Sequence, residues 1–143
     1  MIIYIDGDAC PVIEITKKIC KEKGLSLKVV KDYNHYLNLD YGEVITLDQG
    51  NDFADLYIAN LVTEEDLVIT NDIGLASLIL AKDSSCMNYN GDLIDEANID
   101  YLLFSRHIGK QNRRAGKYGK GPRKRKPEDD LSFESGLRRF LEG

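Results

Sequence analysis

The stretch Ile2-Ile3-Tyr4-Ile5-Asp6-Gly7-Asp8 places a short apolar run directly before two carboxylates. Such a run is typical of a buried strand, because β-branched side chains pack well on a pleated surface. A similar apolar run precedes a single aspartate in Leu67-Val68-Ile69-Thr70-Asn71-Asp72, and a second acidic pair, Asp52 and Asp55, stands at the start of a predicted helix. Aspartates that follow strands or begin a helix therefore guide both the expected fold and the expected site.

The rest of the chain alternates between strand-like and helix-like apolar patterns. Strands are predicted at Ile2–Ile5, Ser26–Val30, Glu43–Leu47, Leu67–Thr70 and Cys86–Tyr89. Helices are predicted at Val12–Lys23, Asp52–Val62, Gly74–Ala81, Asn98–Phe104 and Leu131–Leu141. Strands that alternate with crossover helices indicate an α/β fold with three layers, α/β/α, and a mainly parallel central sheet.

Length and composition favour one domain over residues 1–143. With 43% apolar and 30% charged residues, the chain can bury a core without disulfides or a structural metal. Its three cysteines form no Cys-x-x-Cys pair, which fits reduced thiols. No apolar stretch is long enough for a bilayer, and no basic leader precedes Asp6. We therefore expect a cytoplasmic protein with no membrane partner.

Charge is distributed very unevenly along the chain. Residues 1–105 carry 7 Lys/Arg against 19 Asp/Glu, whereas residues 106–127 carry 10 Lys/Arg and no acid. The second segment is rich in glycine and poor in apolar groups, so we expect it to be mobile and to contact nucleic acid. Alternatively, this segment is a solvated tail that lies against the acidic surface of the same protein. The cations are Arg106, Lys110, Arg113, Arg114, Lys117, Lys120, Arg123, Lys124, Arg125 and Lys126.

The aspartates are candidate ligands for Mg²⁺ or Mn²⁺. Parallel strands end at one edge of a sheet, so carboxylates distant in sequence can meet there and bind hard cations that act on phosphate esters. With His35 and His107 as the only histidines, a zinc site is not expected. Aspartate is also a common helix N-cap, and capping and ligation can coexist. The predicted metal ligands are Asp6, Asp8, Asp52, Asp55 and Asp72, and all of these except Asp52 are the predicted catalytic residues.

Two polar residues before Asp72 have an open role. Thr70 and Asn71 could position a water molecule or a phosphate oxygen, or they could simply form an ordinary turn.

Four segments together resemble the YaiI/YqxD family of uncharacterised bacterial proteins. They are Asp6-Gly7-Asp8-Ala9-Cys10-Pro11, Gly50–Asp55, Asp66–Ala76 and Asn88-Tyr89-Asn90-Gly91, and the resemblance runs almost end to end. That family is similar to the PIN-like metal-dependent nucleases. The resemblance implies a PIN-like domain in which Asp6, Asp8, Asp55 and Asp72 take the acidic positions, with Asp52 as a fifth, and a Mg²⁺- or Mn²⁺-dependent nuclease that prefers RNA.

Two other functions are compatible with the sequence. An Asp-x-Asp motif after a first strand also occurs in haloacid-dehalogenase-like phosphatases, in which Asp6 would be the nucleophile and Asp8 the acid and base. The other alternative is an RNA-binding module without catalysis.

Overall fold

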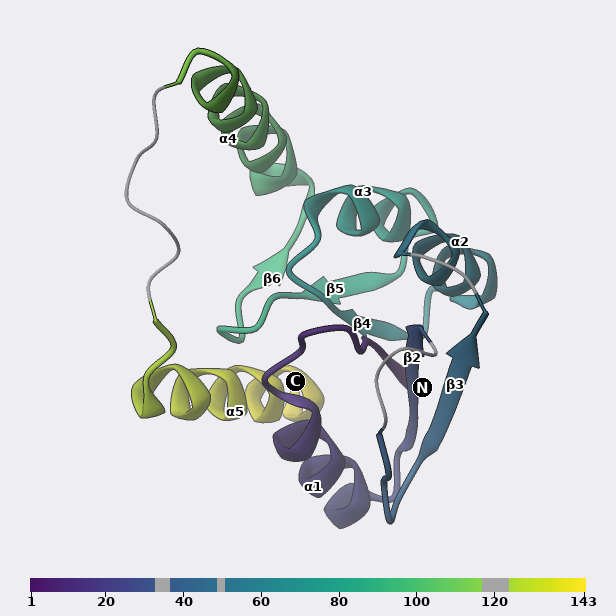
Figure 1. The fold of residues 1–143 in the computed structure, drawn as a ribbon. Coiled ribbons are helices and arrows are strands. Elements are labelled where there is room, and N and C mark those ends of the chain that lie inside the picture. The colour runs from purple at the N-terminus through teal and green to yellow at the C-terminus, as the bar shows by residue number, and fades with distance from the viewer. Residues whose placement is uncertain (33–36, 49–50, 117–123) are drawn as a thin grey trace.

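The computed structural model describes residues 1–32, 37–48, 51–116 and 124–143, without the side chains of residues 51–53. Six strands form one sheet in the order β3-β2-β1-β4-β5-β6 (Figure 1). The strands are β1 (Ile2–Asp6), β2 (Ser26–Asp32), β3 (Glu43–Leu47), β4 (Leu67–Ile69), β5 (Ser85–Met87) and β6 (Leu93–Ile94). The first five are parallel and β6 is antiparallel to β5, so the predicted α/β fold with a mainly parallel sheet is confirmed.

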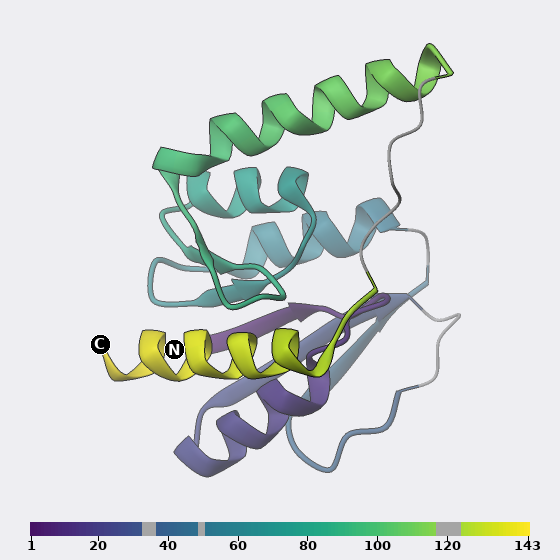
Figure 2. The same cartoon turned by 90° about the vertical axis from the view of Figure 1, so that its left-hand side faces the viewer.

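Helices cover both faces of this sheet (Figure 2). They are α1 (Ile13–Lys23), α2 (Asn51–Leu61), α3 (Ile73–Ala81), α4 (Glu96–Arg114) and α5 (Pro127–Glu142). On one face, Tyr4 of β1 packs in a cluster with Ile58 of α2 and Ile79 of α3. On the other face, Ile5 of β1 packs with Phe133 of α5. Alternate side chains of one strand thus supply two apolar layers, as the two-residue period of a strand requires.

The strand order changes direction between β1 and β4. From β1 the chain adds β2 and then β3 on one side, and it returns to add β4 on the other side. Register pairs Ile5 with Ile69, which brings Asp6 level with Thr70 at the carboxyl ends of the two strands. In open α/β sheets, ligands bind outside the carboxyl ends at such a switch point. The fold therefore makes the edge at Asp6 the favoured place for a site.

Helix α4 is much longer than predicted. It runs from Glu96 to Arg114, so the predicted end at Phe104 is wrong, and residues 106–114 of the segment expected to be mobile are part of this helix. Asp95 starts the helix with a capping box, and extending a formed helix costs far less than nucleating one. Arginine, lysine and glutamine are good helix formers, so little burial is needed to continue it. Residues 117–123 of the predicted segment lie outside the described part of the chain.

Two smaller elements also differ from the prediction. Helix α5 begins at Pro127 instead of Leu131, because proline suits the first helical position and the acids of the first turn favour the helix dipole. Strand β6 has two residues, which is too short for a recognisable alternation. Among the described residues, none of the helices has both the length and the apolar character that a bilayer span would require.

Candidate metal centre

Three aspartates from distant parts of the chain meet at the carboxyl edge of the sheet. Asp6 ends β1, Asp72 precedes α3, and Asp55 lies in the second turn of α2. One carboxylate oxygen from each lies within 4.8 Å of the others, and all three side chains are partly buried. The structure thus brings together three of the five predicted metal ligands. The side chain of Asp52, a fourth, lies outside the described residues.

Asp6 is the electrostatically strained member of this cluster. Burial, followed by the negative charges of Asp8 and Asp72, raises the pKa of Asp6 from 3.8 to about 6. A hydrogen bond from the Thr70 hydroxyl to Asp6 Oδ2, 3.3 Å long, partly opposes this rise. Repulsion of this kind is relieved when a cation binds between the carboxylates.

Asp72 is held in place by the start of α3. Its Oδ1 accepts hydrogen bonds from Gly74 N at 2.8 Å and Leu75 N at 3.3 Å, so it caps the helix. Its own N–H donates to Thr70 Oγ1 at 3.0 Å. Thr70 is fully buried and therefore joins the backbone of Asp72 to the carboxylate of Asp6. The capping role and membership in the cluster coexist in this residue.

Asp8 lines the same hollow from the loop after β1. The hollow has a volume of about 240 Å³ and is lined by Asp6, Asp8, Ala9, Asp55 and Asp72. Oδ1 of Asp8 accepts a hydrogen bond of 3.3 Å from the N–H of Asp32, so the carboxylate is tied to the end of β2. Ala9, for which the sequence predicts no role, has a φ of 56°. Such backbone strain is often found at functional sites.

Asn71 and Arg125, two predicted contacts for substrate, make internal hydrogen bonds. Asn71 Oδ1 accepts a hydrogen bond of 2.8 Å from Tyr89 N. Arg125 Nη2 donates to Tyr89 O at 2.9 Å, and its Nε donates to Asp130 Oδ1 at 2.8 Å. These bonds connect the end of β4, the loop after β5 and the start of α5. Both residues thus help to shape the carboxyl edge.

The other described cations fall into two places. Arg106, Lys110, Arg113 and Arg114 are exposed on α4, while Lys124 and Lys126 are exposed just before α5. Predicted contacts Lys117, Lys120 and Arg123 lie outside the described residues.

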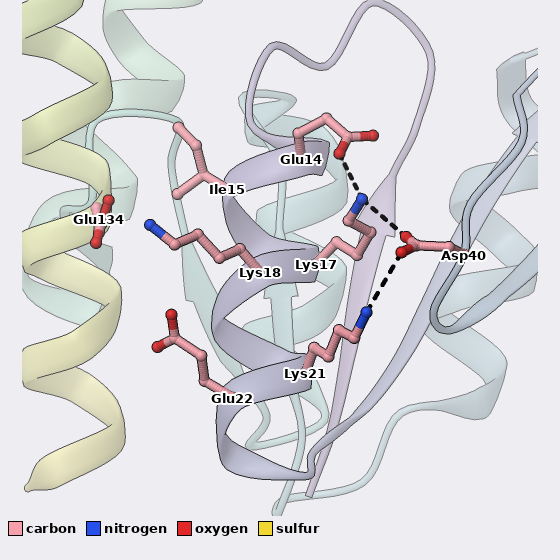
Figure 3. Close-up of a pocket in the computed structure, with 8 residues that line it drawn as sticks. All are labelled: Glu14, Ile15, Lys17, Lys18, Lys21, Glu22, Asp40 and Glu134. Carbon is pink, nitrogen blue, oxygen red and sulfur yellow. Dashed lines mark hydrogen bonds and ion pairs between the residues drawn. The ribbon is translucent and has the colours of Figure 1, made fainter.

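A larger hollow lies beside α1, away from the aspartate cluster (Figure 3). It has a volume of about 710 Å³ and mixed charge on its walls. Lys17 pairs with Glu14 at 2.7 Å and with Asp40 at 2.8 Å, and Lys21 pairs with Asp40 at 3.4 Å. Internal ion pairs already neutralise much of this surface, so the aspartates are the stronger candidate site.

The geometry of the aspartates fits a divalent cation of the Mg²⁺ type. A point equidistant from three atoms separated by 4.8 Å lies about 2.8 Å from each, and Mg–O bonds are about 2.1 Å long. Side-chain shifts of under about 1 Å would close this gap, and water can complete the octahedron. An all-oxygen ligand set also suits Mn²⁺.

Comparison with known proteins shows where this chain belongs. The model of the family described as "Uncharacterized BCR, YaiI/YqxD family" matches residues 4–143. The chain belongs to the YaiI/YqxD family. A UPF0178 protein of Ruminiclostridium cellulolyticum is 42% identical over 141 residues, which cover 99% of this chain and 92% of the relative. A UPF0178 protein of Natranaerobius thermophilus is 44% identical over 142 residues, which cover 99% of this chain and 96% of the relative.

Membership confirms the resemblance seen in the sequence at the level of the YaiI/YqxD family. The names of these relatives state no activity. No solved structure matches the chain.

Proposed function

We propose that this YaiI/YqxD protein is a divalent-metal-dependent nuclease that hydrolyses phosphodiester bonds, with RNA as its preferred substrate. The observation that carries the proposal is the cluster of Asp6, Asp55 and Asp72 at the switch point of the sheet. The resemblance of the YaiI/YqxD family to PIN-like nucleases supports the proposed reaction class and a PIN-like fold. In those nucleases, acidic residues at strand ends bind the metal.

Each residue of the cluster has a defined task in this proposal. Asp6, Asp55 and Asp72 hold Mg²⁺ or Mn²⁺, and Asp8 and Asp52 are additional candidate ligands. A bound divalent cation activates water and neutralises charge that develops on the phosphoryl group. Thr70 acts as a positioning residue, because it is buried and bonds to both Asp6 and Asp72. It reaches the site only through those aspartates.

The acidic body needs cations to bring in a polyanion. Residues 1–105 have an excess of 12 acids over bases, from 19 and 7, so a nucleic acid would be repelled from most of this surface. The proposed substrate contacts are therefore the cations of residues 106–126, of which Arg106 on α4 lies near Gly74 and Asp72 at the start of α3. Screened attraction to phosphates makes such binding dependent on salt.

The decisive test is metal-titrated cleavage of a pooled set of labelled RNA and DNA strands. The wild-type protein should cut in Mg²⁺ or Mn²⁺ and stop in EDTA, and Asp6→Asn and Asp72→Asn should each lower the rate at least about 100-fold. Asp83→Asn is the matched control, since it makes the same chemical change at an exposed turn after α3. Asparagine accepts the left-handed backbone found there, with a φ of 59°.

Three other results would contradict the nuclease proposal or favour another function. Full cleavage by both asparagine variants of the cluster would refute the catalytic assignment. RNA binding without cleavage in any metal would favour the RNA-binding module. A stable beryllofluoride adduct on Asp6, together with hydrolysis of small phosphate monoesters, would favour the phosphatase.

A further inference from the structure

One face of α4 changes from apolar to basic as the helix passes α3. In the first half of α4, Ile99 and Leu103 pack into the cluster that contains α3. Arg106 and Arg113 follow Ile99 at intervals of seven residues, and Lys110 follows Leu103 at the same interval. Seven residues are almost two helical turns, so these three cations continue the face that packs on α3.

The second half of α4 extends past the start of α3. Figure 2 shows α4, in green, lying along α3, in teal, and continuing beyond the end at which α3 begins. That end of α3 lies at the carboxyl edge of the sheet, next to Asp72. The basic part of α4 therefore extends past the end of α3 that lies at the carboxyl edge of the sheet.

Arg106 stands where this basic face meets the aspartate cluster. A Cβ added at Gly74 would lie 3.0 Å from Nη1 of Arg106 and 3.2 Å from Oδ1 of Asp72. The guanidinium and the carboxylate are thus neighbours of the same backbone position in the first turn of α3. From there, α4 carries Lys110 and Arg113 outward over a rise of about 10 Å.

From this placement, and resting on the function proposed above, we propose that Arg106, Lys110 and Arg113 form a cationic track that binds consecutive phosphates of one RNA strand and leads it to the metal site. Arg106 contacts the phosphate nearest to the cluster, because its guanidinium offers a planar fork that matches phosphate oxygens. Lys110 and Arg113 bind the phosphates that follow. All three side chains are exposed to solvent and available to a ligand.

The track can be tested by the salt dependence of RNA binding. Binding of labelled single-stranded oligouridylate would be measured by fluorescence anisotropy over a series of KCl concentrations, in EDTA so that no cleavage occurs. Each phosphate contact contributes about 0.7 to the slope of log K against log salt for a single strand. The triple variant Arg106→Gln, Lys110→Gln, Arg113→Gln should therefore lower the slope by about 2. Glutamine keeps helix propensity, and circular dichroism checks that α4 is retained.

A triple variant elsewhere supplies the matched control. Lys18→Gln, Lys23→Gln and Lys82→Gln remove the same charge from exposed positions on α1 and after α3, and this variant should keep the wild-type slope. Arg106→Lys should also keep the slope but weaken cleavage in Mg²⁺, since charge is retained and the fork is lost.

The outcomes separate the track from the proposed nuclease activity. Equal losses of slope in both triple variants, or no loss in the α4 variant, would overturn the track even if wild-type protein cleaves RNA. A selective loss in the α4 variant combined with absence of cleavage in every metal would support the track and refute the nuclease.

Discussion

Replacing Asp6 with asparagine should make the metal-free protein more stable while it removes stabilisation by magnesium. Asp6 is partly buried beside two other carboxylates, Asp8 and Asp72, and its negative charge is unfavourable there. Asparagine has nearly the same shape and keeps an oxygen that can accept the hydrogen bond from Thr70. The substitution therefore removes the charge with little change in packing.

The size of the effect follows from the pKa of Asp6. This pKa is about 6 in the folded protein, above its ordinary value of 3.8, so ionised Asp6 opposes folding. As pH rises from about 4 to above 6, Asp6 ionises and the free energy of unfolding of the wild-type protein falls. The variant has no carboxyl group at this position, so its stability does not change for this reason. The difference reaches an upper limit of about 3 kcal/mol at pH 7.5 and is about 0.5 kcal/mol at pH 4. For a chain of this length, the upper limit corresponds to about 10 °C in Tm.

Thermal unfolding between pH 4 and pH 8, with EDTA and with excess MgCl₂, measures both effects. In EDTA the Asp6→Asn variant should melt above the wild-type protein, and the difference should grow with pH. Added MgCl₂ should raise the Tm of the wild-type protein but not that of the variant, because a ligand that binds only the folded state stabilises it. Asp83→Asn should follow the wild-type protein in every buffer.

Two results would refute this reasoning. If Asp6→Asn melted below the wild-type protein at pH 7.5 in EDTA, the ionised carboxylate would not be the source of strain. If MgCl₂ stabilised the variant as much as the wild-type protein, Asp6 would not be a metal ligand.

The remaining predictions concern the cluster and the packing around it. Affinity for Mg²⁺, measured by calorimetry, should fall as pH drops below about 6 because Asp6 becomes protonated. Asp72→Asn should lose Mg²⁺ binding but keep the helix cap, whereas Asp72→Ala should also lose about 1 kcal/mol in urea unfolding. Gly136→Ala should cost at least about 2 kcal/mol in urea unfolding, since its Cβ would lie only 2.7 Å from Gly91 Cα. Arg125→Gln should cost about 1–2 kcal/mol and increase hydrogen exchange at the start of α5.

The core strands were predictable because their signal is local. Ile2–Ile5 and Leu67–Thr70 are short β-branched or apolar runs, and both form strands at the centre of the sheet. Their parallel direction followed from the helices between them, and it was enough to predict that Asp6 and Asp72 would approach each other. Helix α4 was harder to predict, because the capped first turn and the packing of Ile99 support a basic extension that has few apolar residues of its own.

Residue order alone, through local periodicity and the parallel connections it implies, established the layers of this domain and the edge on which its aspartates stand. Beyond the approach of Asp6 and Asp72, only the folded chain decided which side chains meet there, because register and helix crossing depend on packing between distant segments. Register places Asp6 level with Thr70, and the passage of α4 along α3 brings Arg106 beside Gly74. Neither of these two contacts could be predicted from the spacing of residues in the sequence. The residues of each pair are more than 30 positions apart and are brought together only by packing in the core.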